Sequence, residues 1–183
     1  MRRLYLPLIA ICCMRFAAAE PIVIETAMLD MVIAEDATLQ SLRTAGSEQE
    51  IARPGMPMAY ARLAAADQPI AATAAAAEGD RITWSFGESG ISATVSWQEA
   101  DGMPVFTLQE IVGDPAQLDL LALPLAEGGA LRAGGHAVEY DDGAGVALIG
   151  DTQECWIHAD ATPRLFASYA AGVSTLPVQA AVI

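Results

Sequence analysis

Residues 79–112 carry the clearest hydrophobic pattern of the chain, a strict alternation of apolar and polar positions. Every second residue over 82–86 and over 91–97 is apolar, and the residues between them are Ser or Thr. A period of two places such residues on opposite faces of a β-strand. Glycine-containing turns separate these two strands from a third at 105–112, which predicts a meander with one apolar and one solvated face. A second layer must cover the apolar face.

The other apolar runs are equally short, and turns rich in Gly, Pro or acidic residues separate them. Short apolar runs bounded in this way are typical of strands. A polar turn followed by alternating residues lies at 35–43, and we predict further strands over residues 21–24, 28–34, 118–125, 136–140, 146–149, 154–158 and 178–183. The last run has no polar tail, which indicates either an interior strand or a chain that continues beyond it.

Two segments leave helix and strand open. Residues 58–77 are rich in alanine, which favours a helix at 59–67, but Pro69 interrupts the run. The alternative is two strands linked at 67–69, and the surrounding turn spacing favours it. Residues 163–169 fit a short helix or an extended edge strand. The fold class is therefore all-β, a two-layer antiparallel β-sandwich with at most one short helix.

Residues 1–19 are predicted to be a secretory signal peptide and not part of the fold. Arg2 and Arg3 precede an apolar stretch at 4–14, and three alanines at 17–19 provide a small-residue cleavage site. The apolar stretch is too short for a permanent membrane-spanning helix. We therefore expect a secreted or periplasmic protein with no membrane contact after cleavage, and a single domain at 20–183 that is complete or lacks a C-terminal part.

Acidic residues dominate the predicted mature chain. Residues 1–19 hold three of the nine arginines and no acidic residue, and the sequence has no lysine, so cleavage leaves 6 basic against 23 acidic residues and a net charge of −17. A protein of this charge lacks the basic surface that nucleic-acid binding requires. The acidity itself is explained by solubility and self-repulsion in an exported protein.

Neither a metal site nor a cofactor is expected. Cys155 is the one cysteine outside residues 1–19, so no internal disulfide can form, and its strand-like surroundings indicate a buried thiol. Cys155 and His158 are three positions apart, which on a strand directs them to opposite faces. His136 with the methionine pairs Met28/Met31 and Met56/Met58 is a weak copper pattern, for which methionine as core filler is the simpler explanation. The acidic turn at 141–143 does not have the spacing of a calcium loop.

Five short stretches carry a resemblance to a known family. They are an acidic turn leading into Thr-Leu-Gln-Ser-Leu at 35–42, a Pro-Gly-Met-Pro step at 54–57, and the strands at 79–86, 89–95 and 105–108. Their order resembles the β-supersandwich domain, of the galactose-mutarotase-like type, at the N-terminus of secreted glycoside hydrolases. The resemblance implies a module that precedes a catalytic barrel, which this chain does not contain, and it transfers no catalytic residue.

Candidate ligand contacts are aromatic residues that could stack on sugar rings. Trp84 and Trp97 fall on apolar strand faces, which predicts core packing, whereas Tyr140 and Trp156 remain as ligand-binding candidates. Glycoside hydrolysis needs two carboxylates held across the scissile bond. Glu88, Glu99 and Glu110 lie at turns or strand ends, where we expect solvated surface positions and no catalytic pair. The chain also lacks a G-x-S-x-G nucleophile motif and a phosphate-binding loop.

These observations lead to one main functional hypothesis and two others. The chain is expected to be a non-catalytic β-sandwich module of an exported carbohydrate-active protein, which contacts glycan or supports a following catalytic domain. The alternative is a free-standing secreted or periplasmic protein that binds a partner. An independent small hydrolase or metal protein has the weakest support in the sequence.

Overall fold

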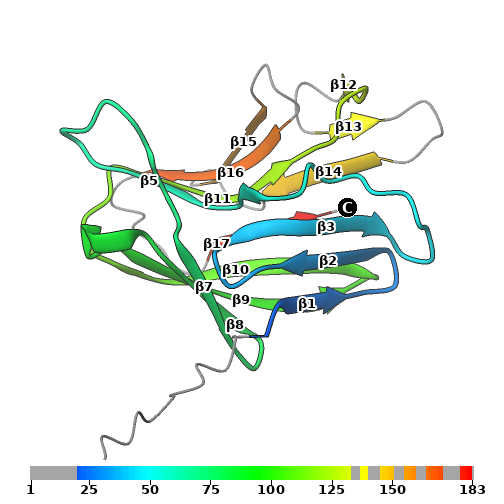
Figure 1. The fold of residues 1–183 in the computed structure, drawn as a ribbon, viewed down its shortest axis with the longest axis horizontal. Coiled ribbons are helices and arrows are strands. Elements are labelled where there is room, and N and C mark those ends of the chain that lie inside the picture. The colour runs from blue at the N-terminus through cyan, green and yellow to red at the C-terminus, as the bar shows by residue number, and fades with distance from the viewer. Residues whose placement is uncertain are drawn as a thin grey trace, which may run out of the picture.

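The computed structural model of the chain describes residues 20–132, 137–139, 145–150, 155–159, 164–170 and 178–182. Strands account for 63% of the structure and helix for 2%, in several antiparallel sheets, so the fold is all-β and sandwich-like as predicted (Figure 1). The predicted signal peptide at 1–19 lies outside the described residues. Within the described part, no helix is both long and apolar enough to cross a membrane.

The described residues form three antiparallel sheets. The four-stranded sheet runs in the order β1 (Ile22–Glu25), β2 (Leu29–Ile33), β3 (Thr38–Thr44) and β4 (Met56–Pro57). The eight-stranded sheet runs β12 (Ala130–Arg132), β13 (Ala137–Glu139), β14 (Gly145–Gly150), β17 (Val178–Val182), β10 (Met103–Val112), β9 (Ser92–Ala100), β8 (Arg81–Ser85) and β7 (Ala74–Glu78). The five-stranded sheet runs β15 (Cys155–Ala159), β16 (Arg164–Ala170), β11 (Gln117–Pro124), β5 (Tyr60–Arg62) and β6 (Ile70–Ala71).

The predicted meander is confirmed as β8, β9 and β10, which are neighbours in the eight-stranded sheet. A single 3₁₀ turn, η1 (Gly87–Ser89), connects β8 to β9. Ile82 and Trp84 of β8 and Phe106 of β10 are buried, whereas the Ser and Thr positions of β8 and β9 are half-buried on the other face. The alternation along the sequence therefore reports correctly which face each side chain occupies.

Both ambiguous segments are strands. The alanine-rich segment forms β5, β6 and β7, so strand pairing overrides the helix propensity of alanine there. The segment predicted at 163–169 as a short helix or an extended edge strand contains β16, so the extended alternative is confirmed. β16 is not an edge strand, because it is hydrogen-bonded to β11 on one side and to β15 on the other. β17, which lies within the strand predicted at 178–183, is also interior, between β14 and β10.

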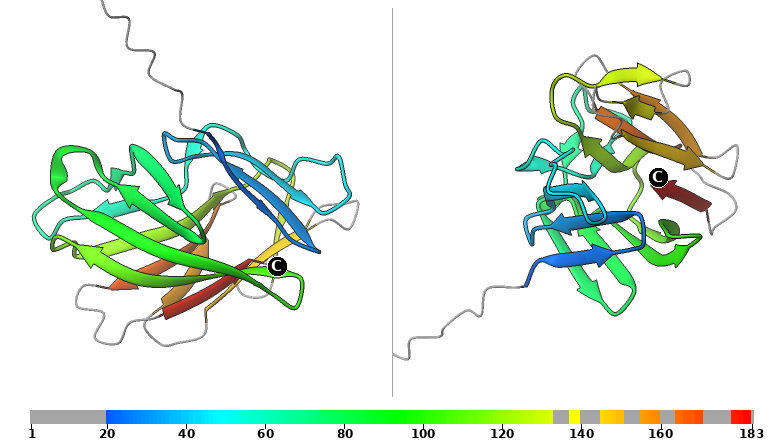
Figure 2. Two further views of the ribbon diagram at one scale, coloured as in Figure 1. Left: turned by 90° about the horizontal axis from the view of Figure 1, so that it is seen from below. Right: turned by 90° about the vertical axis from the view of Figure 1, so that its right-hand side faces the viewer.

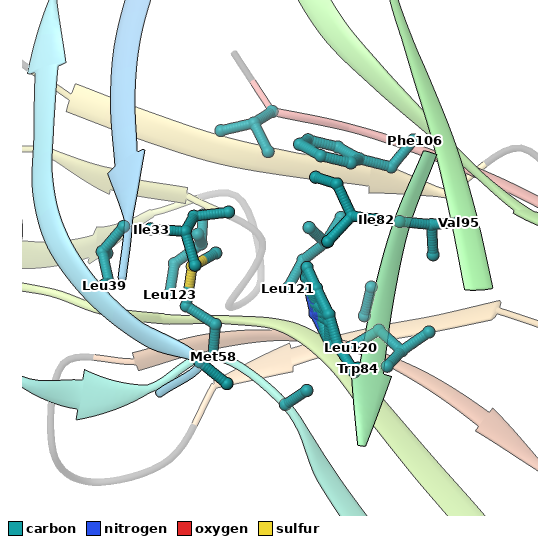
Figure 3. Packing of buried hydrophobic residues seen from close by; sticks show 14 of the residues in the cluster. Ile33, Leu39, Met58, Ile82, Trp84, Val95, Phe106, Leu120, Leu121 and Leu123 are labelled. Carbon is teal, nitrogen blue, oxygen red and sulfur yellow. The ribbon is translucent and has the colours of Figure 1, made fainter. Parts of the chain in front are cut away.

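One hydrophobic core lies between the sheets. Figure 3 shows Ile33 and Leu39 of the four-stranded sheet on one side of this interior and Ile82 and Phe106 of the eight-stranded sheet on the other. Leu121 of the five-stranded sheet packs in the same cluster. The two further views in Figure 2 show the same layers from below and from the side, with β17 lying against the meander.

The segment at 50–58 links the four-stranded sheet to the five-stranded sheet. Its Ile51 amide donates to Leu42 O of β3 at 2.8 Å, and its Arg53 amide donates to Pro124 O of β11 at 2.8 Å. Met58 accepts from the Ala122 amide through its carbonyl oxygen at 2.7 Å. The segment therefore supplies backbone partners to both sheets and keeps them in one layer.

Gly113, which follows β10, lies so close to Ile91 that a larger residue there would probe the packing of the core. Its φ is +88°, and an added Cβ would lie 3.1 Å from Cγ1 of the buried Ile91 and 3.2 Å from Gly90 O. Gly128 has a similar φ of +94° but nothing within 4 Å. We expect Gly128→Ala to cost about 1 kcal/mol through left-handed strain alone, and Gly113→Ala to cost about 2–3 kcal/mol through strain plus contact. Urea unfolding measures both, and equal losses would show that the contact relaxes without cost.

Candidate functional site

Of the two aromatic ligand-binding candidates, Tyr140 and Trp156, the structure describes the backbone of Trp156 alone. Tyr140 lies outside the described residues, as does His136. Trp156 belongs to β15, the strand at one end of the five-stranded sheet. Trp84 is buried to 1% exposure and Trp97 packs partly buried against the core, so both predictions of core packing are confirmed.

Backbone pairing places Trp156 in a row of residues that crosses four strands. Trp156 pairs with Ser168 of β16, Ser168 pairs with Asp119 of β11, and Asp119 pairs with Tyr60 of β5. We call these four register positions the polar row. The row continues to Ala71 of β6, which pairs with Tyr60.

Asp119 and Tyr60, two positions of the polar row, lie on the face of the sheet that points away from the core. Leu118 and Leu120, which flank Asp119 along β11, are both 1% exposed and belong to the core cluster. Asp119 and Tyr60 are half-buried. Because side chains alternate along a strand, Asp119 must project from the opposite face to its two leucine neighbours.

Hydrogen bonds fix the Asp119 carboxylate in one orientation. The Ser168 hydroxyl and the Gln117 side-chain amide both donate to Asp119 Oδ1, each at 2.6 Å. Ser168 is only 2% exposed, so this polar side chain is buried but satisfied. The structure gives Asp119 Oδ2 no partner among the described residues, which leaves that oxygen as an acceptor held in place by its neighbours.

A second pair of residues widens the same face. Gln117 of β11 pairs with Arg62 of β5, one step along both strands from the polar row. Arg62 is exposed, and among the described residues it forms no ion pair. The face thus combines the Tyr60 ring and the Arg62 guanidinium of β5 with the Asp119 carboxylate and the Gln117 amide of β11.

A different polar surface covers the outer face of the meander. The Thr83 and Thr94 hydroxyls lie 3.1 Å apart across β8 and β9, and Glu110 of β10 pairs with Thr94. A β-bulge between Leu108 and Glu110 exposes both Gln109 and Glu110. This surface is the solvated sheet face that the Ser and Thr positions predict, and it has no aromatic side chain at these positions.

The three acidic residues considered for glycoside chemistry are surface residues. Glu88 is exposed in η1, and Glu110 is exposed at the bulge. Glu99 accepts a hydrogen bond from the Ala27 amide at 3.1 Å and so joins the β9–β10 turn to the β1–β2 turn. Glu88 and Glu99 lie at a turn and a strand end, as the sequence predicted, whereas Glu110 lies within β10 at the bulge.

Within the described part of the chain, no cluster of three or more His, Cys, Asp or Glu residues could hold a metal ion. Met31 and Met58, two methionines of the weak copper pattern, are fully buried core residues. The acidic turn at 141–143 lies outside the described residues. Cys155 and His158 both belong to β15, three positions apart.

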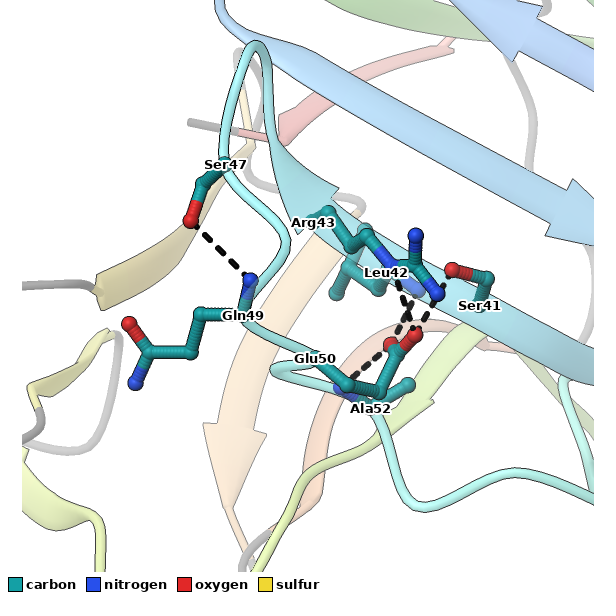
Figure 4. A network of polar contacts seen from close by, with 7 residues as sticks. All are labelled: Ser41, Leu42, Arg43, Ser47, Gln49, Glu50 and Ala52. Atoms are coloured by element: carbon teal, nitrogen blue, oxygen red, sulfur yellow. Dashed lines mark hydrogen bonds and ion pairs between the residues drawn. The ribbon is translucent and has the colours of Figure 1, made fainter.

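Glu50 is a structurally important residue that the sequence analysis did not identify. Its Oε1 accepts from the Leu42 amide at 2.6 Å and the Ala52 amide at 3.1 Å, and its Oε2 accepts from the Ser41 hydroxyl at 2.7 Å and Arg43 Nε at 3.1 Å (Figure 4). Partial burial raises the pKa of Glu50, but these four hydrogen bonds together hold the pKa below its ordinary value of 4.5. The carboxylate attaches the linking segment to β3 and has no capacity left for a ligand.

Comparisons with protein-family models, with curated proteins and with solved structures found no match to this chain. The resemblance to the galactose-mutarotase-like domain of glycoside hydrolases therefore remains a prediction from the sequence.

Proposed function

We propose that the chain is an exported, non-catalytic β-sandwich module that contacts glycan through the polar row. The observation that carries this proposal is the Asp119 carboxylate, held by Ser168 and Gln117, in register with Tyr60 and Trp156. An aromatic ring packs against the C–H face of a pyranose, and a fixed carboxylate oxygen accepts hydrogen bonds from sugar hydroxyls. In the parent protein, such a module holds a neighbouring catalytic domain on its substrate.

The residue types in the polar row favour binding over catalysis. Among the side chains of the polar row, the Ser168 hydroxyl most resembles a catalytic nucleophile. Its hydrogen-bond partner is the Asp119 carboxylate and not an imidazole. A serine needs a general base to become a nucleophile at neutral pH. The Asp119–Ser168 bond therefore orients a binding group, and the proposal assigns no catalytic residue.

The first test is binding of the full chain to a panel of soluble polysaccharides: starch, xylan, glucomannan, hydroxyethyl cellulose, polygalacturonate and alginate. Retardation in native gels that contain each polymer measures the affinity. We expect at least one polymer to retard the chain, and Tyr60→Ala and Asp119→Asn each to weaken that binding about tenfold, or ~1.4 kcal/mol.

Two control variants separate loss of contact from loss of fold. Tyr60→Phe keeps the ring and should retain most of the binding. Asp80→Asn removes an exposed carboxylate at the β7–β8 turn, on another sheet, and should change nothing. Tyr140→Ala tests the other aromatic candidate. If no polymer is retarded, the glycan proposal is wrong and binding of a partner protein becomes the better explanation of this surface.

A further inference from the structure

The first strand of the four-stranded sheet, β1, has a strand neighbour on one side only. It ends the order of that sheet and pairs with β2 (Figure 1). The Thr26 amide donates to Leu29 O at 3.0 Å, which makes these two residues a hydrogen-bonded pair beside the turn. Such pairs alternate along an antiparallel ladder, so the N–H and C=O groups of Val23 and Glu25 point away from β2. Within the described part of the chain, no turn or loop bonds to these outward groups.

An exposed apolar side chain lies beside the open backbone groups of β1. Ile22 and Ile24 are 7% and 0% exposed and belong to the core, whereas Val23 is 51% exposed. Met28, in the turn to β2, is 50% exposed. β1 contains no Pro, Lys or bulge, which are features that keep edge strands from pairing with another chain. The strand is therefore open to the addition of a further strand.

Two carboxylates face each other at the same edge. Glu25 of β1 pairs with Asp30 of β2, and like charges placed directly opposite are destabilising. Arg43 of β3 is in register with Asp30 but forms its ion pair with Glu50. Among the described residues, neither Glu25 nor Asp30 forms an ion pair. A cation supplied by another chain would reduce the repulsion between them.

The charge of the protein favours a basic partner over a second copy of the chain. The sequence carries a net charge of −14, and Glu99 adds a further carboxylate at the β1–β2 turn, where it accepts from the Ala27 amide. A second copy would bring the same carboxylates to the contact and meet repulsion. A basic segment would instead be attracted to this edge.

We propose that β1 binds an extended, basic segment of a partner protein, which adds to the four-stranded sheet as a fifth strand. The segment pairs through its backbone with Val23 and Glu25, as in other cases of strand addition. One of its apolar side chains packs on Val23, and a lysine or arginine two positions away lies opposite Glu25. β1 and the polar row belong to different sheets, so the proposal is independent of glycan binding.

Fluorescence anisotropy of a labelled nine-residue peptide, titrated with the full chain, measures this binding. The probe is Thr-Val-Thr-Lys-Thr-Val-Thr-Lys-Thr, which places Val and Lys on one face when it is extended. The matched control peptide carries Glu in place of both Lys residues. We expect the lysine peptide to bind about tenfold or more tightly than the glutamate peptide at low salt, and the difference to shrink at high salt.

Amide hydrogen exchange followed by NMR locates the bound peptide. The Val23 and Glu25 amides should exchange rapidly in the free chain and about tenfold or more slowly when the lysine peptide is saturating. The Ile24 amide points to β2 and should change little, so it is an internal control.

Four variants test the backbone and the charge separately. Val23→Pro removes one outward N–H without removing a β1–β2 hydrogen bond, and it should abolish peptide binding. Val23→Thr keeps the amide and a branched side chain and should retain binding. Glu25→Lys should remove the preference for the lysine peptide, and it should fold, because it places opposite charges at the pair with Asp30. Glu78→Lys makes the same charge change on β7, the edge strand of the eight-stranded sheet, and should leave the preference unchanged.

Several outcomes would overturn the proposal. These are equal or absent binding of the two peptides, binding that survives in Val23→Pro, and protection of β7 amides in place of those of β1. Self-association of the natural chain in sedimentation experiments, lost in Val23→Pro, would show that a second copy occupies the edge. A thermal melt verifies the fold of each variant, and Glu25→Lys keeps the test decisive should Val23→Pro not fold.

Discussion

Replacement of Trp84 by alanine is expected to lower the free energy of unfolding by about 3–5 kcal/mol, as for other fully buried aromatic residues. Trp84 is 1% exposed, and its neighbours across the adjacent strands are Ala75 and Ala93. Two alanines beside a tryptophan have no side-chain atoms that could move into the space that the indole leaves. The cavity therefore stays open, and the loss of unfolding free energy includes the full cost of the cavity.

Trp84→Phe separates the packing of the ring from the cost of its polar atom. The indole Nε1 of Trp84 is buried and has no hydrogen-bond partner among the described residues. An unpaired buried donor costs about 1–3 kcal/mol of desolvation, which phenylalanine does not incur. We expect Trp84→Phe to lie within about 1 kcal/mol of the natural protein, because this relief offsets the loss of ring area.

Guanidinium chloride unfolding, followed by circular dichroism, measures both Trp84 variants. Trp97→Ala is the matched control, because Trp97 is only partly buried and should cost less than Trp84→Ala. If Trp84→Phe proves as destabilising as Trp84→Ala, the indole N–H has a partner in solution and the polar cost assigned to it is wrong.

Replacement of Glu50 by alanine is the second large expected effect, a loss of about 2–3 kcal/mol at neutral pH. The change removes the acceptor of four hydrogen bonds and leaves the Leu42 and Ala52 amides without it. The side chain is 27% exposed, so water replaces part of what is lost and the figure stays below that of a fully buried carboxylate. Glu48→Ala, in the same loop but exposed, should change stability by less than about 0.5 kcal/mol.

The contribution of Glu50 should depend on pH in a defined direction. Its pKa is lower in the folded protein than the ordinary value of 4.5, so the unfolded chain takes up the proton first as the pH falls. The stabilisation is therefore complete above about pH 5–6 and is lost below pH 4.5, as the pH passes through the folded pKa. Asp36 acts in the same direction, because the Thr38 hydroxyl and amide lower its pKa through hydrogen bonds.

Urea unfolding of the natural protein and of Glu50→Gln between pH 3 and pH 7 measures this dependence. The difference in stability between the two proteins should be constant near neutral pH and shrink in acid. A difference that stays the same at every pH would mean that Glu50 stabilises the linking segment through its shape and not through its charge.

Much of the fold could be predicted from the sequence, because burial and turn conformation are properties of individual residues. The alternation at Ile82, Trp84 and Phe86 records which face of the strand meets the core, because each residue responds to its own burial. Turns at glycine positions are local in the same way, since a positive φ is required at one residue. Alanine-rich β7 was ambiguous because alanine suits a helix, and only its pairing with β8 decides for a strand.

The candidate site could be predicted only in part. Trp156 stood out as an aromatic residue, but Tyr60 and Asp119 carried no signal of their own, and they lie far from it in the sequence. Glu50 looked like one more acidic residue of a polar loop. Its importance comes from the return of residues 50–52 to β3, which brings the Leu42 and Ala52 amides to one carboxylate.

The sequence alone determined the strands with alternating residues, their apolar faces and the all-β class, because each residue of such a strand is apolar or polar according to its own burial. In the alanine-rich segment it left helix and strand open. The tertiary structure decided which strands are neighbours and in which register they pair. Backbone hydrogen bonds between strands are the same for every sequence, so the register follows from burying all the apolar faces at once. That global choice places Tyr60, Asp119, Ser168 and Trp156 in one row, which no local pattern in the chain records.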